Sequence, residues 1–578
     1  MQEQNSEKGD IMRKKRIIPF IVLLTAVCFF LICSQLQDKS FDILITNGKI
    51  INGTGNPWFY GDVGIKDNTI AAIGDLGHKT AETIIDAKGL VVTPGFIDIH
   101  THCDDGLDKP SSNENLNYLI QGTTTVRTGS CGTGTYKIAE TKKAWEKQGI
   151  GTNAVLLVGN VPIRKKVMGE EQLRAPTQEE IKKMQELVRQ AMSEGAWGIS
   201  TVLEYGGYNK VVTTEEIVAI TQPVAEYHGV YSSHMRDEAA HILEAIKETI
   251  RISEKTGVPV NCTHLKVTGK KNWGLMKEVV KLINDARDRG IMVTADQYPF
   301  IQGAPIDFIT ELVDIPEDME PLAGLREKLW KPELSPGQRD QIRQQYVAEL
   351  QKALQDPTKR KSIKASTYEK RLDNPSPVAR WGWHDFRIKV ADKNSHLVDK
   401  MLVDIIQEKN RDGFDIVADL IMEEPNILFA SGSQSKDDMR YAMVQDWVMV
   451  SSDGQAYPII KETDKPKRGH PRDFSSQTIV LQKFVREENL LILENAVRKM
   501  TSLPAQFLKM EDRGLLLEGY RADIVVFNPE TVQDNATYQN AHQYATGVEY
   551  VIVNGKISVE KGKYNGTLSG KVLLKPSL

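Results

Sequence analysis

The chain has 578 residues and a mass of 64.8 kDa, too long for one ordinary small domain. Hydrophobic residues make up 40% and charged residues 26%, as in a globular protein with a large core. The formal net charge of -4 is nearly balanced, which argues against a nucleic-acid-binding protein. Its five cysteines are too few for a disulfide framework in a chain of this length.

The first 40 residues have the order of an export signal or a membrane anchor. A basic cluster, Arg13 to Arg16, precedes an uncharged apolar run from Ile17 to Ser34. That run is longer than a usual signal core and slightly short of the roughly 20 residues that span a bilayer. We therefore expect an exported bacterial protein, periplasmic, extracellular or anchored through residues 12–34. Cleavage, lipid modification at Cys33 and retention of the segment all stay open.

Short alternating β-patterns follow, and they return at the other end of the chain. In Phe41 to Val92, turn signals such as Asn47-Gly48 separate apolar runs. The same texture recurs in "ADIVVFNPE" and "VEYVIVNGKISVEKGKYNG". We predict one β-sandwich assembled from both ends, residues 41–95 and 505–578.

The middle of the chain alternates β-rich runs with amphipathic helical stretches such as "TQEEIKKMQELVRQAMSEG". Eight parallel strands, each followed by a helix, form a (β/α)8 TIM barrel, a fold of the α/β class. We predict this barrel over residues 96–504. The candidate strands are 96–102, 123–129, 154–159, 197–203, 230–235, 259–264, 292–297 and 447–453.

The gap between the seventh and eighth candidate strands is anomalous, at about 150 residues. A connection of that length should hold its own structure. It contains the charged segment "PGQRDQIRQQYVAELQKALQDPTKRKS". We therefore predict a helical insertion, about residues 303–395, lying over the barrel mouth.

Chemistry-bearing side chains occur where the predicted strands end. His100 and His102, in "PGFIDIHTHCD", are two residues apart, so both imidazoles point to the same side of the first strand. Active sites of such barrels form at this carboxyl end of the strands. Four more metal-competent residues end or follow other strands: Cys131, His234, His264 and Asp453.

Imidazole and thiolate ligands together favour Zn²⁺ over the hard cations, which prefer oxygen. A zinc site of this kind lowers the pKa of bound water to roughly 7 and supplies hydroxide at neutral pH. Asp453 beside that water can take its proton and pass it to a leaving amine. The pattern predicts metal-assisted hydrolysis of an acyl bond.

The ordered motifs resemble a known family. "PGFIDIHTHCD" is similar to the first-strand signature of the amidohydrolase superfamily. The D-aminoacylase branch, the N-acyl-D-amino-acid deacylases, is resembled by "TGSCG", "SSHMRDE", "THLKVTGKKNWG", "ADQYPF", "VSSDG" and "HPRDF". The match covers roughly Phe41 to Lys561, without parts of the insertion.

The resemblance implies a ligand set. Cys131, His234 and His264 would hold a tightly bound zinc, with cysteine in place of the carbamylated lysine of hydantoinase-like relatives. His100, His102 and Asp453 would form a second, weaker position, with Asp453 also the general base. One zinc is essential in this scheme, and occupation of the second position stays open.

The resemblance also assigns Lys266, Tyr298 and Arg472 to a free carboxylate of a small-molecule substrate. A lysine supplies a point charge, a tyrosine a hydroxyl donor and an arginine a bidentate fork. Tyr205 would stand at the rim, and Arg236 would orient a ligand from behind. "GNVPIR", "STVLEYGGY" and the loop from Asp453 to Arg472 depart from the family pattern, so substrate identity stays open.

The sequence is compatible with three functions. The first is a zinc hydrolase that removes the acyl group from N-acyl-D-amino acids or cleaves related dipeptides, by attack of a metal-activated hydroxide. The second is a cyclic-amide hydrolase of the hydantoinase or dihydropyrimidinase type. The third, a non-catalytic binding protein, is disfavoured because no ligand or base is missing. Stereochemistry, acyl group, side-chain preference and oligomeric state are left undetermined.

Overall fold

The structure is a computed structural model that describes residues 41–205, 207–303, 305–306, 312–329, 336–369, 376–461, 463–464 and 466–576. Its centre is a parallel barrel in which all eight predicted strands are present and neighbour one another in chain order. The strands are β6 Phe96–Asp98, β7 Thr123–Thr128, β8 Asn153–Gly159, β9 Gly198–Val202, β10 Val230–His234, β11 Val260–Cys262, β12 Val293–Gln297 and β16 Val448–Val450.

Helices cover the outside of the barrel strands. The helix α6 begins after Thr177, whose side chain forms a reciprocal capping box with Glu180. The helix α9 is followed by Gly257 in the left-handed conformation, which is a common way for a helix to end. The principal outer helices are α4 Ile138–Gln148, α6 Gln178–Ser193, α8 Thr214–Glu226, α9 Ile242–Thr256, α10 Met276–Asp288, α18 Lys436–Met443 and α20 Leu493–Met500.

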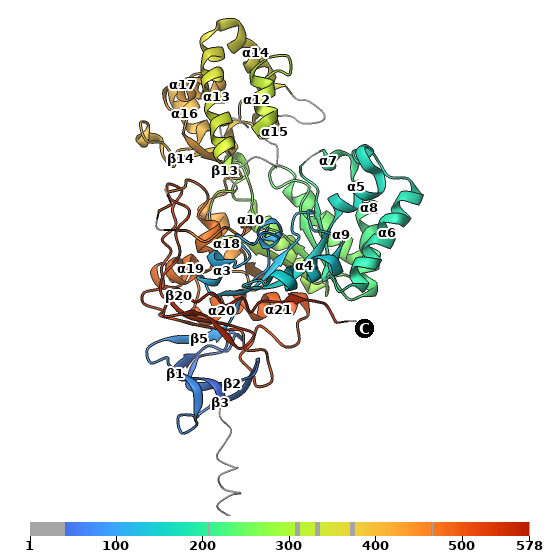
Figure 1. Ribbon diagram of the computed structural model, residues 1–578. Coiled ribbons are helices and arrows are strands. Elements are labelled where there is room, and N and C mark those ends of the chain that lie inside the picture. Colours follow the sequence, from blue (N-terminus) through green and yellow to red (C-terminus); the bar gives the residue numbers. More distant parts are fainter. Residues whose placement is uncertain are drawn as a thin grey trace, which may run out of the picture.

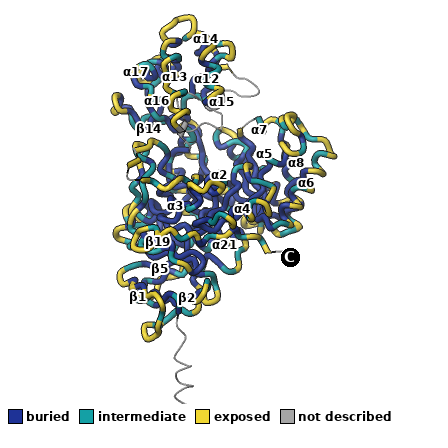
Figure 2. The backbone as a smooth tube through the Cα atoms, in the orientation of Figure 1, coloured by how far each residue is buried: buried dark blue, intermediate teal, exposed yellow. Residues whose placement is uncertain are grey.

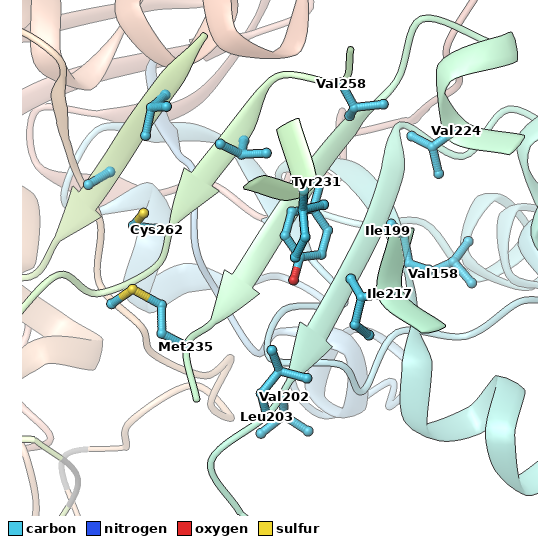
Figure 3. Close-up of a cluster of buried hydrophobic side chains, with 14 of the residues drawn as sticks. Val158, Ile199, Val202, Leu203, Ile217, Val224, Tyr231, Met235, Val258 and Cys262 are labelled. Atoms are coloured by element: carbon cyan, nitrogen blue, oxygen red, sulfur yellow. The ribbon is translucent and has the colours of Figure 1, made fainter. Parts of the chain in front are cut away.

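The apolar core lies between these two layers. Val158 and Ile199 of the strands lie beside Ile217 and Val224 of α8 (Figure 3). Cys262 belongs to the same buried cluster and therefore serves packing. Figure 2 shows that buried residues are concentrated in the barrel, while exposed residues lie mainly on loops and outer helices. The strand ends that carry the site are thus held by a large, rigid core.

Backbone contacts bring the first and last strands together beyond their ends. Asp453 N–H donates to the carbonyl of His100 at 2.9 Å, and His102 N–H donates to the carbonyl of Gly454 at 2.7 Å. Thr101 and Gly454 form a parallel bridge between the same two segments. These contacts place Asp453 beside the two histidines, although 351 residues separate it from His102.

The two ends of the described chain build one sheet below the barrel. The strand β5 of the N-terminal part pairs antiparallel with β17 of the C-terminal part. Isoleucines and valines of both parts share a buried cluster, as a domain made from both ends requires. Its strands are β1 Phe41–Ile50, β2 Phe59–Lys66, β3 Thr69–Gly74, β4 Ala81–Asp86, β5 Val91–Pro94, β17 Ile524–Phe527, β18 Val548–Val553, β19 Lys556–Glu560 and β20 Lys563–Tyr564.

The long connection between β12 and β16 folds around a hydrophobic core of its own, with members from Leu312 to Phe429. It projects from one end of the barrel, at the top of Figure 1. A three-stranded sheet accompanies the predicted helices, and its strands are too short to leave a clear alternating pattern. The elements are β13 Pro305–Ile306, α12 Leu322–Leu329, α13 Pro336–Gln355, α14 Pro357–Tyr368, α15 Pro377–Trp381, β14 Arg387–Val390, α16 Leu402–Lys409, α17 Gly413–Glu423 and β15 Leu428–Ala430.

The predicted signal or anchor, residues 1–40, lies outside the described residues, as do Cys28 and Cys33. Within the described chain, no helix has both the length and the apolarity that a membrane span needs. Export, anchoring and the domain boundaries given above stay predictions.

Candidate metal centre and binding cavity

All six predicted metal ligands lie at the carboxyl rim of the barrel. Five of them contribute ligand atoms to two overlapping groups, within each of which the atoms lie no more than 4.8 Å apart, and His102 belongs to neither group. One group contains His100, Cys131, His264 and Asp453. The other contains His234 and His264 together with Glu238, a residue that the sequence analysis did not select.

The Cys131 thiol is central to the first group. Its Sγ lies 3.4 Å from Nε2 of His100 and 3.5 Å from Nε2 of His264. The same Nε2 of His264 lies 2.9 Å from Nδ1 of His234. Side chains from strands one, two, five and six therefore meet around one point.

Asp453 completes this half of the cavity from the last strand. Its Oδ1 lies 3.1 Å from Nε2 of His102 and 3.3 Å from Nε2 of His100. Its Oδ2 accepts a hydrogen bond from Nη1 of Arg472 at 2.7 Å. We call the six residues together the metal half of the cavity: His100, His102, Cys131, His234, His264 and Asp453.

Three of the six residues adopt the left-handed backbone conformation, which residues other than glycine rarely adopt. The φ angles are 46° at Cys131, 36° at His264 and 53° at Asp453. Such conformations persist only where the surroundings hold them, and they gather at functional sites. The chain bends sharply at these strand ends and turns the side chains inward.

Ser200 of β9 holds the turn that carries Cys131. Its hydroxyl accepts a hydrogen bond from Gly132 N–H at 3.0 Å and donates to the carbonyl of Gly129 at 2.5 Å. One buried side chain therefore joins the residues on either side of Ser130 and Cys131. Ser200 was not predicted as a site residue, since a serine in a strand carries no distinctive signal.

Each of three histidines is also held at the ring nitrogen that faces away from the cluster. Nδ1 of His100 lies 3.2 Å from Asp296, Nε2 of His234 lies 3.1 Å from Glu204, and Nδ1 of His264 lies 2.8 Å from Glu238. Carboxylates in this position fix the tautomer and orientation of metal-binding imidazoles. Their signal in the sequence was only a polar residue near a strand end.

Arg236, expected to orient a ligand, does not do so. It forms an ion pair with Glu248 at 2.7 Å and donates to the carbonyl of Asn209. The prediction was wrong because its side chain extends toward α9, whereas Glu204 reaches His234 from the neighbouring strand.

The charges within the metal half suit a thiolate and a carboxylate. Burial alone would raise the pKa of Cys131, but the imidazoles of His100, His102 and His234 outweigh it and hold that pKa well below its usual value. Burial would also raise the pKa of Asp453, yet Arg472 and His100 keep it well below its usual value. Both groups therefore carry negative charge at neutral pH.

These residues fit a divalent metal. Sulfur and imidazole nitrogen are zinc's preferred donors, and a single carboxylate completes the common sets. The imidazoles converge on the thiolate and are fixed from behind by carboxylates. His100, Cys131, His264 and Asp453 offer ligand atoms within 4.8 Å of one another and could hold such an ion, and His234 adjoins them through His264.

The three residues assigned to a substrate carboxylate line the other half of the same cavity, and we call them the carboxylate half. The ring of Tyr298 lies between two cations, 5.8 Å from Nζ of Lys266 and 5.5 Å from Cζ of Arg472. Lys266 is already paired with Glu238 at 2.5 Å, and Arg472 contacts Asp453.

Tyr298 differs from these two cations in one respect. Its Oη is buried and has no hydrogen-bond partner among the described residues. Burial raises its pKa to about 12, against the lowering effect of Lys266 and Arg472, so the hydroxyl keeps its proton. A buried donor without an internal acceptor is rare, and here it lines a cavity.

The cavity that joins the two halves has a volume of about 360 Å³. Tyr205 lines its rim, with its ring centroid 4.6 Å from that of His234. The insertion contributes a separate wall, made by Asp385, Ser431 and Gly432. These last three residues were not predicted from the sequence, because no local pattern shows that they face the barrel.

Comparisons with known proteins agree with this geometry. The model of the amidohydrolase family matches residues 83–360 and 462–559. A D-aminoacylase of Alcaligenes xylosoxydans xylosoxydans is 31% identical over 93% of this chain and 99% of its own length. A crystal structure of D-aminoacylase superposes with a TM-score of 0.68 at 29% identity, covering 92% of this chain and all of that one.

An N-acyl-D-glutamate deacylase of Bordetella bronchiseptica, solved with zinc and a phosphonate inhibitor, also has a TM-score of 0.68, at 27% identity. It covers 93% of this chain and all of the solved one. Matches of this extent, joined to a cysteine-containing donor cluster at the rim of the barrel, assign the chain to the amidohydrolase family, in its D-aminoacylase branch, as a metal-dependent hydrolase.

Proposed function

We propose that the protein is a zinc-dependent deacylase that removes the acyl group from N-acyl-D-amino acids. The observation that carries the proposal is the union, in one cavity, of a thiolate–imidazole cluster with a cationic wall and a buried tyrosine donor. The first half suits attack on an amide carbonyl, and the second suits a free carboxylate. We infer the D configuration of the substrate from the relatives, whose names specify D-amino-acid substrates.

The residues divide the work as follows. A zinc ion held at Cys131, His234 and His264 would polarise the amide carbonyl and lower the pKa of water. Asp453, ionised at neutral pH, accepts the proton of the attacking water and returns it to the leaving amine. Arg472 touches Asp453 and therefore fixes the direction in which that carboxylate points.

The carboxylate half positions the substrate. Tyr298 Oη donates to a substrate carboxylate oxygen, because it has no other acceptor among the described residues. Lys266 and Arg472 flank the tyrosine ring and supply positive charge. Binding of the carboxylate there aligns the scissile amide with the metal half, which lies across the same cavity.

A cyclic-amide hydrolase of the hydantoinase type is the weaker candidate. Its metal bridge is a carbamylated lysine, whereas here Cys131 lies between His100 and His264. Lys266, the lysine of the cavity wall, is committed to Glu238.

The test uses the full chain loaded with zinc and a panel of N-acetyl-D- and N-acetyl-L-amino acids together with dihydrouracil. Release of D-amino acids is expected, with L-isomers and the cyclic amide untouched. Asp453→Asn should lower kcat by about 10²- to 10⁴-fold, the usual contribution of a general base, while zinc content stays near the wild-type value. Hydrolysis of the cyclic amide alone would refute the proposal, and an unchanged kcat in Asp453→Asn would remove the assigned base.

A further inference from the structure

Asp385 is the acidic side chain that the insertion contributes to the cavity. It ends a short 3-10 helix, Trp383–Asp385, and lines the cavity beside Ser431 and Gly432. Its Oδ2 accepts a hydrogen bond from Gly432 N–H at 2.9 Å, which ties the helix to the wall. The residue is only 4% exposed, so its carboxyl is buried at the cavity wall and away from bulk solvent.

Nothing in the described protein neutralises this carboxyl group. It takes part in no ion pair with a described lysine, arginine or histidine, and its buried Oδ1 completes no hydrogen bond of good geometry. Lys266, whose charge acts on Asp385 across the cavity wall, is committed to Glu238 at 2.5 Å. Burial and the nearby Glu204 raise the pKa of Asp385 to about 7, although two backbone N–H groups and Lys266 oppose them.

The position of Asp385 indicates which part of a substrate it would meet. A Cβ built on Gly432 would lie 3.6 Å from Cε of Lys266, so the wall that Asp385 holds adjoins the carboxylate half. A substrate carboxylate bound there brings its own α-carbon close to this wall. The group that extends from the α-carbon is the amino-acid side chain, whereas the acyl group extends toward the metal half.

We propose that Asp385 selects substrates whose D-amino-acid side chain carries a cation, as in N-acyl-D-lysine or N-acyl-D-arginine. The inference rests on the proposed deacylase function and names its substrate class. An ammonium or guanidinium supplies the counter-charge and the donor that the buried carboxylate lacks. Neutral side chains leave that carboxylate buried and unpaired, and acidic ones repel it.

The first experiment compares kcat/KM of the zinc-loaded full chain for N-acetyl-D-lysine and N-acetyl-D-norleucine. These substrates have the same carbon chain and differ only in the terminal amine. We expect the lysine derivative to be preferred by about tenfold or more, since a site with a buried polar group discriminates against analogues that lack its partner. A preference for norleucine would overturn the inference.

The second experiment repeats the comparison in Asp385→Asn, whose amide oxygen can still accept the Gly432 N–H. The preference for lysine should fall to near one, while kcat/KM for norleucine changes less than about threefold. Glu317→Gln, an exposed change on the same insertion, serves as the matched control and should keep the preference. Equal losses for both substrates in Asp385→Asn would mean that Asp385 only supports the wall, and would overturn the inference.

Two further outcomes separate the sources of the cation and the two proposals. Glycyl-D-norleucine carries its ammonium on the acyl side, so selective loss of its cleavage in Asp385→Asn, with N-acetyl-D-lysine unaffected, would overturn the assignment to the side chain. Calorimetric binding of both acetylated ligands is measured beside turnover. Preferential binding of the lysine ligand without any hydrolysis would refute the deacylase function and support the cation site. Hydrolysis of both substrates without preference would support the deacylase function and refute the cation site.

Discussion

The two halves of the cavity are built on opposite plans. In the metal half, three imidazoles are fixed from behind by Asp296, Glu204 and Glu238, and the cysteine turn is fixed by Ser200. On the substrate side, Tyr298 Oη and Asp385 Oδ1 are buried without partners among the described residues. Carboxylates of the protein lie against the imidazoles, although Nδ1 of His100 and Oε1 of Glu238 complete no hydrogen bond of good geometry among the described residues. The two groups on the substrate side have no such charged neighbour at the unpartnered atom and are left for a ligand to satisfy.

This contrast has an energetic meaning. A buried polar group without a partner costs roughly 1–3 kcal/mol. Such a cost at Tyr298 or Asp385 is recovered only when a suitable ligand binds. In the metal half the energetic cost is backbone strain, because Cys131, His264 and Asp453 adopt the left-handed conformation.

The largest effect should follow from removing the thiolate. Cys131→Ala should lower zinc affinity by at least about 10³-fold, because loss of a ligand must exceed the 10- to 100-fold cost of losing a residue that supports one. Zinc content after dialysis against a chelator, measured with kcat/KM, tests this. Cys262→Ala is the control, since Cys262 packs in the core and should keep its zinc. Retention of zinc by Cys131→Ala would contradict the account of the metal half.

A smaller effect is expected from Ser200→Ala. The change leaves Gly132 N–H and the carbonyl of Gly129 without their partner, so the cysteine turn loosens and zinc affinity falls by roughly 10- to 100-fold. Thr201→Val is the matched control, because it removes a neighbouring buried hydroxyl that contacts Tyr231 instead. Chelator competition should separate the two variants even where their thermal stabilities fall equally. Equal zinc affinities would show that the turn does not depend on Ser200.

The smallest of the three effects is expected from a change in the carboxylate half. Tyr298→Phe should reduce kcat/KM for N-acetyl-D-amino acids by roughly tenfold, the value of a hydrogen bond of about 1.5 kcal/mol to a charged group. Zinc content should stay at the wild-type value and thermal stability should be equal to or above it, because the change removes a buried hydroxyl that has no partner within the described protein. A marked loss of stability with unchanged kcat/KM would show that the Tyr298 hydroxyl supports the fold and does not bind the substrate.

The strands of the barrel and most of the metal half were predictable from local patterns. All eight strands are present where short apolar runs alternate with helical stretches, although most are shorter than predicted. The pair His100 and His102 was recognisable because residues two apart on a strand share a side. The supporting residues Ser200, Glu204, Glu238 and Asp296 were not, because a serine or carboxylate near a strand end is common in any sequence.

The amino-acid sequence alone was sufficient for the barrel, the ligand types and the family resemblance, since these depend on periodicity and on spacing along one strand. Tertiary structure decided which side chains meet across the barrel: that Arg472 contacts Asp453, that Arg236 turns toward Glu248, and that Asp385 enters the cavity from a separate core. Such contacts join segments far apart in the chain. Their geometry follows from strand closure and from the packing of the insertion, which no local pattern encodes.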